Sequence, residues 1–165
     1  MTKSWQSIVE CLREEISEYG QLLNLFAAQQ DLIFKRKPNE VLELSSKIHA
    51  QVEILETRRS EREAKVRDFA ISHGLDADST LRSMVQYFDA EARPLLVALI
   101  ADVNLLIHRV RRSLRLNHRL LSCMVDSHQA VLKRVQPDSF NTTYSAMGRV
   151  TSSAVRSEPR FVLAG

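Results

Sequence analysis

The sequence predicts an all-α protein, an elongated antiparallel bundle or coiled coil of three long helices and one short helix. Only four glycines and four prolines occur among 165 residues, so the chain has few residues suited to turns. Apolar residues recur every three or four positions over long stretches, which is the period of one helix face. We expect residues 1–137 to form the bundle and residues 138–165 to form a mobile C-terminal tail.

The first helix is expected over residues 2–34. A basic run, Lys35-Arg36-Lys37, suits a helix C-terminus, and Pro38 prevents its continuation. The predicted apolar face contains Trp5, Ile8, Val9, Leu12, Ile16, Tyr19, Leu22, Leu23, Phe26 and Ile33. The residues expected to lie off this face are Glu10, Glu14, Glu15, Glu18 and Gln29.

The second helix is expected to begin with Asn39 as its N-cap and to end at Gly74, which suits a left-handed C-terminal residue. Its predicted inner face contains Val41, Leu44, Ile48, Val52, Leu55, Arg59, Arg62, Val66 and Phe69. The remaining surface of this helix mixes acidic and basic residues, as expected for a face in water.

A short helix is expected to start at Ser79, and the last long helix is expected to run from Arg93-Pro94 to Pro137. Asn117 interrupts the apolar face of this last helix. It either fixes the helix register or marks the point where the packed core stops and another molecule is received. The predicted face contains Leu96, Leu99, Val103, Leu106, Val110, Leu114, Asn117, Leu121, Met124, His128, Val131 and Val135.

The basic excess of the chain is concentrated in one segment. The formal net charge is +3, and residues 94–137 carry seven basic residues against two acidic ones. A nucleic-acid-binding helix is one interpretation, but residues 89–139 lack the aromatic side chains that stack on bases. The alternative is a solvated or partner-facing surface that contacts the acidic residues of the first helix. The arginines are Arg109, Arg111, Arg112, Arg115 and Arg119.

Motifs for catalysis or cofactors are missing from the sequence. The four glycines are far apart, so no phosphate-binding loop is present, and no Glu-x-x-His or His-Glu-x-x-His metal pattern occurs. We interpret Cys11 and Cys123 as reduced thiols of a cytoplasmic protein, because two cysteines are too few for a disulfide framework. We expect no enzymatic activity, cofactor or metal, no signal peptide and no membrane insertion.

Several short segments form a pattern along the chain. The second helix carries Lys47 and then Glu56-Thr57-Arg58-Arg59, and a short leucine-bearing segment separates it from the long last helix. Two further matches are Leu116-Asn117-His118-Arg119-Leu120-Leu121 and Thr143-Tyr144-Ser145-Ala146-Met147-Gly148. These segments and their order resemble the FlgN-type flagellar export chaperones. The arginine-rich stretch and the Ser/Arg-containing tail depart from the family pattern.

The resemblance implies a cytoplasmic chaperone that binds hook–filament junction (hook-associated) subunits, keeps them unassembled and delivers them to the export apparatus. A helical groove that covers the amphipathic helix of a client accounts for such a role physically. The implied partner-binding residues are Asn117, Leu120, Leu121, Met124, Val125, Leu132, Tyr144, Met147 and Gly148. For Leu121 and Met124, packing in the core of the bundle is the alternative. A nucleic-acid-associated helical protein and a structural coiled-coil adaptor remain the alternatives, and association with a second copy stays open.

Overall fold

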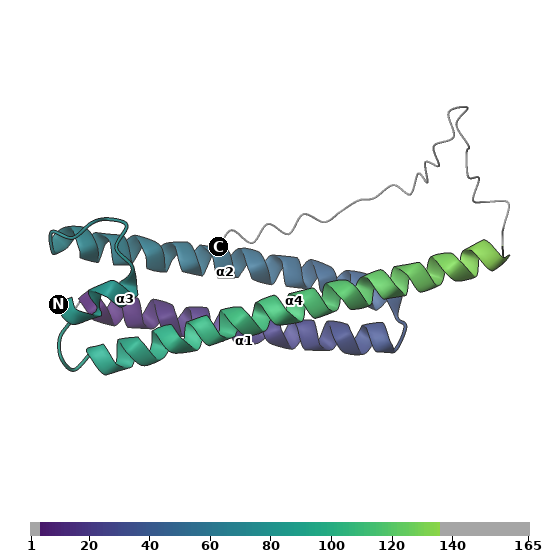
Figure 1. Cartoon of the computed structure of the whole chain (residues 1–165), viewed down its shortest axis with the longest axis horizontal. Helices are drawn as coiled ribbons and strands as arrows, with labels where there is room; N and C mark the ends of the chain where they lie inside the picture. The colour runs from purple at the N-terminus through teal and green to yellow at the C-terminus, as the bar shows by residue number, and fades with distance from the viewer. Residues whose placement is uncertain (1–3, 136–165) are drawn as a thin grey trace, which may run out of the picture. The chain divides into compact units, whose positions relative to one another are not determined.

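The computed structural model describes residues 4–135, and within this range every regular element is a helix. The elements are α1 (Ser4–Phe34), α2 (Pro38–Ser72), α3 (Leu81–Met84), the 3₁₀-helix η1 (Val85–Tyr87) and α4 (Arg93–Val135) (Figure 1). The all-α bundle predicted from the sequence is therefore confirmed.

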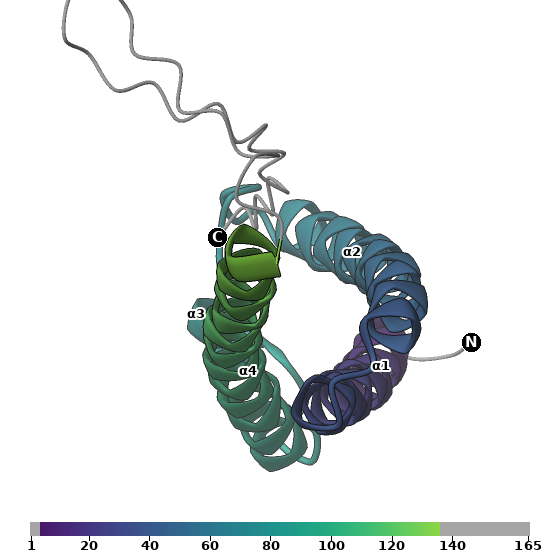
Figure 2. The same ribbon diagram turned by 90° about the vertical axis from the view of Figure 1, so that its right-hand side faces the viewer.

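The chain divides into two units, with the boundary between residues 124 and 125. The first unit holds α1, α2, α3, η1 and residues 93–124 of α4; α2 packs antiparallel to α1 (Figures 1 and 2). The described part of the second unit is residues 125–135. The predicted boundary between bundle and tail, after residue 137, lies outside the described residues.

The helices α1 and α2 each end in a hydrogen-bonded turn of the same type. At the end of α1, the Lys37 amide donates to the Leu32 carbonyl at 3.1 Å, and Arg36 has φ 55°. At the end of α2, the Leu75 amide donates to the Ala70 carbonyl at 2.9 Å, and Gly74 has φ 66°. The prediction for Gly74 is confirmed, whereas Arg36 adopts a left-handed conformation that costs a non-glycine residue about 1–2 kcal/mol.

The N-cap prediction for α2 is wrong, because the helix begins two residues earlier. Lys37 is the N-cap and Pro38 is the first helical residue, so Asn39 lies inside the first turn. Proline suits this position because its fixed φ matches the helix and no amide hydrogen is needed there. The short helix α3 is capped by Thr80, whose hydroxyl accepts the Ser83 amide at 3.2 Å.

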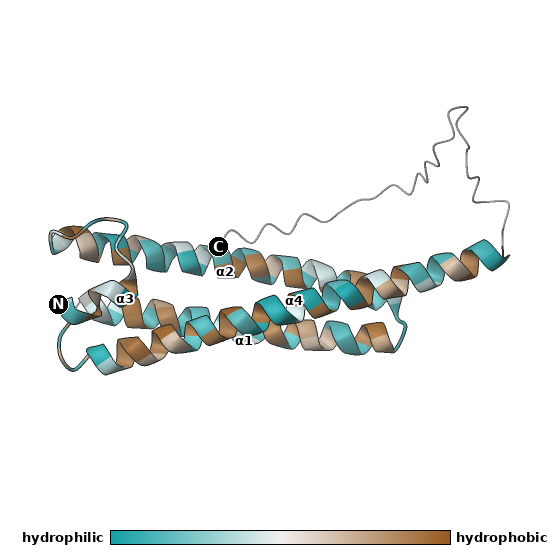
Figure 3. Cartoon of the chain, viewed as in Figure 1, coloured by the Kyte–Doolittle hydropathy of each residue, from teal (hydrophilic) through white to brown (hydrophobic). Residues whose placement is uncertain are grey.

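The core of the first unit is formed by the inner faces of the long helices, closed by the short segment. Phe88, which follows η1, stacks on Phe69 of α2 with ring centroids 4.0 Å apart. Trp5 of α1 donates its indole N–H to Asp89 at 3.0 Å, which ties the start of α1 to the loop before α4. Along α4, hydrophobic and hydrophilic residues alternate (Figure 3), as an amphipathic helix requires.

Candidate functional site

A buried ion pair joins α1 to α2. Glu15 is completely buried, and the Arg62 guanidinium Nε donates to its carboxylate at 2.5 Å. The prediction that Glu15 lies off the packed face of α1 is wrong. It continues the four-three spacing of Ile8 and Leu12, so it points inward and needs a cationic partner there.

Tyr19 lies one helical turn after Glu15 and is also buried. Burial, and secondarily the negative charge of Glu15, raise the pKa of Tyr19 to about 12. The positive charges of Arg59, Arg62 and Arg111 act in the opposite direction.

The other acidic residues of α1 also find their partners on α2. Glu14 lies 3.3 Å from Arg58, and the Gln51 amide donates to the Glu18 carboxylate at 2.5 Å. The expectation that the acidic residues of α1 contact the arginines of α4 is therefore wrong for Glu14, Glu15 and Glu18.

A polar layer crosses the core at Asn117, which is 2% exposed. Its amide nitrogen donates to the Phe26 carbonyl at 3.1 Å and to Gln29 at 2.8 Å, and its oxygen accepts from Gln30 at 2.6 Å. Gln29 in turn donates to Ser45 of α2 at 2.9 Å. This layer supports the register interpretation of Asn117. It also corrects the prediction that Gln29 lies off the packed face of α1, because Gln29 is buried.

The apolar face of α4 contains fully buried residues up to Asn117 and none among residues 118–135. Leu96, Leu99, Val103 and Val110 are buried in the core. Past the polar layer, the predicted partner-binding residues of the first unit are half-buried; they are Leu120, Leu121 and Met124. Leu106 and Leu114, before the layer, are half-buried as well, so the change past Asn117 is that buried apolar residues no longer occur on α4.

In the second unit, all side chains from residue 125 to residue 135 are exposed. Two predicted partner-binding residues lie here: Val125 is 53% exposed and Leu132 is 50% exposed. Val131 and Val135 are also exposed, as is His128. The remaining predicted residues, Tyr144, Met147 and Gly148, lie outside the described part of the chain.

Four arginines on the outer surface of α4 form what we call the arginine band, defined as Arg109, Arg112, Arg115 and Arg119. All four are exposed, and none takes part in the ion pairs found among residues 4–135. Neighbours in the band are three or four residues apart. Such like-charge pairs destabilise a helix by about 0.2–0.5 kcal/mol each. The band therefore contributes nothing favourable to the isolated fold through ion pairing.

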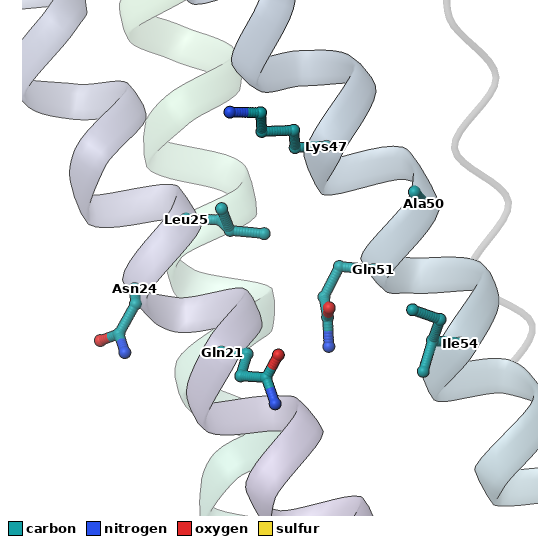
Figure 4. Close-up of a pocket in the computed structure, with 7 residues that line it drawn as sticks. All are labelled: Gln21, Asn24, Leu25, Lys47, Ala50, Gln51 and Ile54. Atoms are coloured by element: carbon teal, nitrogen blue, oxygen red, sulfur yellow. The ribbon is translucent and has the colours of Figure 1, made fainter.

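A shallow, open hollow of about 450 Å³ lies between α1 and α2 (Figure 4). Its apolar residues are Leu25, Ala50 and Ile54, and its polar residues are Gln21, Asn24, Lys47 and Gln51. Among these lining residues, there is no charged pair and no cluster of nucleophilic side chains.

Among the described residues, no group of three or more His, Cys, Asp or Glu side chains is arranged to hold a metal ion. No helix between residues 4 and 135 is long and apolar enough to cross a bilayer. Cys11 is buried with Lys65 Nζ 3.1 Å from its sulfur, and Cys123 is exposed.

The fold and its surfaces define a class: an all-α protein whose last helix exposes apolar side chains that suit the binding of another polypeptide. The family model described as FlgN protein matches residues 1–152. The chain therefore belongs to the FlgN family of flagellar export chaperones, whose partners are flagellar proteins. Comparisons with curated proteins and with solved structures found no match.

Proposed function

We propose that this chaperone works in the cytoplasm, binds hook–filament junction subunits, keeps them unassembled and delivers them to the export apparatus. The observation that carries the proposal is the change along α4: its buried apolar residues all precede Asn117, and its apolar residues from 118 to 135 are half-buried or exposed. A client helix that covers these side chains gains about 25 cal/mol for each Å² of apolar surface removed from water.

The proposed contact residues are Leu120, Leu121 and Met124 in the first unit and Val125 and Leu132 in the second. Met124 suits a surface that accepts more than one client, because methionine side chains adapt their shape. Asn117 supports this surface from within the core, since its amide is already engaged by α1. We retain Tyr144, Met147 and Gly148 as proposed contacts that fold over the bound client.

The experiment measures the affinity of the purified chain for a hook-associated subunit of the same organism. The test variant combines Val125→Glu with Leu132→Glu, and the matched control combines Val97→Glu with Ile71→Glu. All four positions are 50–60% exposed, so the substitutions leave the core intact. We expect the test variant to bind at least about tenfold more weakly, because it buries two unpaired carboxylates at the interface.

The control variant is expected to bind as the unchanged chain does. Equal losses in both variants, or no loss in the test variant, would contradict the proposed surface. Removal of residues 138–165 separates the proposal from a structural coiled-coil adaptor. An adaptor keeps its partner after this truncation, whereas the proposed chaperone binds its client much more weakly.

A further inference from the structure

We propose that the arginine band, together with Leu105 and Leu116, is a second docking surface that binds an acidic amphipathic helix of another protein. This surface lies entirely in the first unit and uses none of the proposed client contacts. The inference therefore does not rest on the proposed function.

The first argument is the arrangement of the exposed side chains. The positions 105, 109, 112, 116 and 119 follow a four-three-four-three spacing, so they form one stripe along α4. At 100° per residue, the leucines and the four arginines fall within an arc of about 120°. Val103, Val110 and Asn117 lie on the opposite, buried side of the helix.

The second argument is that the band serves no purpose within the described part of the fold. Residues 103–125 carry five arginines and no acidic residue, so repulsion along the helix is not balanced locally. Three of the four glutamates of α1, Glu14, Glu15 and Glu18, are bound to α2. The positive charge therefore remains available to a partner of opposite sign.

The third argument identifies the class of partner. Leu105 is 50% exposed and Leu116 is 45% exposed, and both lie among the arginines. A phosphate backbone neutralises arginines but does not cover leucine side chains, and this segment has no aromatic residue for base stacking. The same lack of aromatic residues disfavours a helix lying in a membrane surface. A partner helix that carries carboxylates and apolar side chains on one face can pair with the arginines and also cover the two leucines.

The experiment uses the full chain and four probes. The first probe is a helical peptide with Glu and Leu on one face, and the second is the same peptide with Gln in place of every Glu. The third is single-stranded polyuridine RNA, and the fourth is a vesicle of phosphatidylglycerol. Binding is measured at low and at physiological salt, since a charge-based contact weakens as salt screens it.

The test variant combines Arg112→Glu with Arg119→Glu. Its matched control, Arg67→Glu with Arg82→Glu, changes the net charge equally at exposed arginines on α2 and α3. We expect the acidic peptide to bind the unchanged chain and the control alike, and the test variant at least about tenfold more weakly. A Leu105→Ser, Leu116→Ser variant is expected to lose about fivefold, and the Gln peptide is expected not to bind.

Circular dichroism verifies that each variant keeps its helix content, as expected for exposed positions. Failure of the acidic peptide to bind, or equal loss in test and control variants, would overturn the proposal. Binding of RNA or vesicles that depends on the arginines but not on the leucines would also overturn it. That result would assign the band to nucleic acid or lipid instead.

Discussion

Two groups of arginines, one on α2 and one on α4, have opposite surroundings. On α2, Arg58 lies 3.3 Å from Glu14, Arg59 lies 2.8 Å from Glu63, and Arg62 pairs with buried Glu15. On α4, the arginine band has no ion pair among residues 4–135. Residue type alone therefore does not reveal the role of an arginine. The position of the nearest carboxylate decides whether its charge supports the fold or faces solvent.

The largest expected effect on stability is at Arg62, the arginine that pairs with a buried carboxylate. Arg62→Met leaves the Glu15 carboxylate buried without its cation, which we expect to lower the free energy of unfolding by about 3–5 kcal/mol. Chemical denaturation measures the change. Arg58→Met, at an exposed pair, is the control and is expected to lower stability far less, because solvent screens its charges. Equal losses at the two positions would remove the distinction between buried and exposed pairs.

The next effect tests the one buried polar residue that α4 contributes to the core. Asn117→Ala leaves the side-chain amides of Gln29 and Gln30 without this partner, and we expect a loss of about 1–3 kcal/mol. Asn104→Ala, at an exposed asparagine of the same helix, is the control and is expected to change stability by less than about 0.5 kcal/mol. A loss no greater at Asn117 than at Asn104 would mean that the polar layer does not hold α4 in register.

A smaller effect on stability is expected from Tyr19, and only at high pH. Between about pH 10 and about pH 12, the unfolded chain loses the Tyr19 proton while the folded chain retains it. Stability therefore falls as pH rises through this window, by roughly 1 kcal/mol at pH 11. Thermal unfolding at pH 9 and pH 11 should show a smaller drop for Tyr19→Phe than for the unchanged chain. An identical drop in both proteins would argue against burial of Tyr19 next to Glu15.

The smallest effect is expected for an exposed arginine of α4, and here stability is expected to rise rather than fall. Arg112→Gln removes two like-charge contacts, with Arg109 and with Arg115, and keeps a good helix former. We expect stability to stay unchanged or to rise by up to about 1 kcal/mol. A clear loss of stability, measured by the same denaturation experiment, would reveal a carboxylate partner for the band.

The spacing of apolar residues predicted the helices well, because a packed helix face must repeat every three or four residues. It also predicted that Arg62 faces inward, since this arginine continues the apolar row of α2. The predictions for Glu15 and Gln29 were wrong because the polarity of these residues, and not their spacing, was used to assign them to a helix face. Their spacing from Leu12 and Phe26 puts them on the packed face of α1.

The partners of buried polar residues were harder to predict than their positions. Asn117 was recognised as an interruption of the apolar face, but its partners Gln29 and Gln30 come from a helix almost ninety residues away in sequence. No local pattern relates such distant residues. The start of α2 was missed for a local reason, because Asn39 is a favourable N-cap and Pro38 is an equally favourable first helical residue.

The connection between α1 and α2 contains only residues 35–37. Closing so short a loop costs little chain entropy, so these two helices can pair while the rest of the polypeptide is still being synthesised. Glu14, Glu15 and Glu18 of α1 can then reach their partners on α2 before α4 has been synthesised. Pairing of α1 with α2 in this order leaves these three carboxylates unavailable to the arginines of α4.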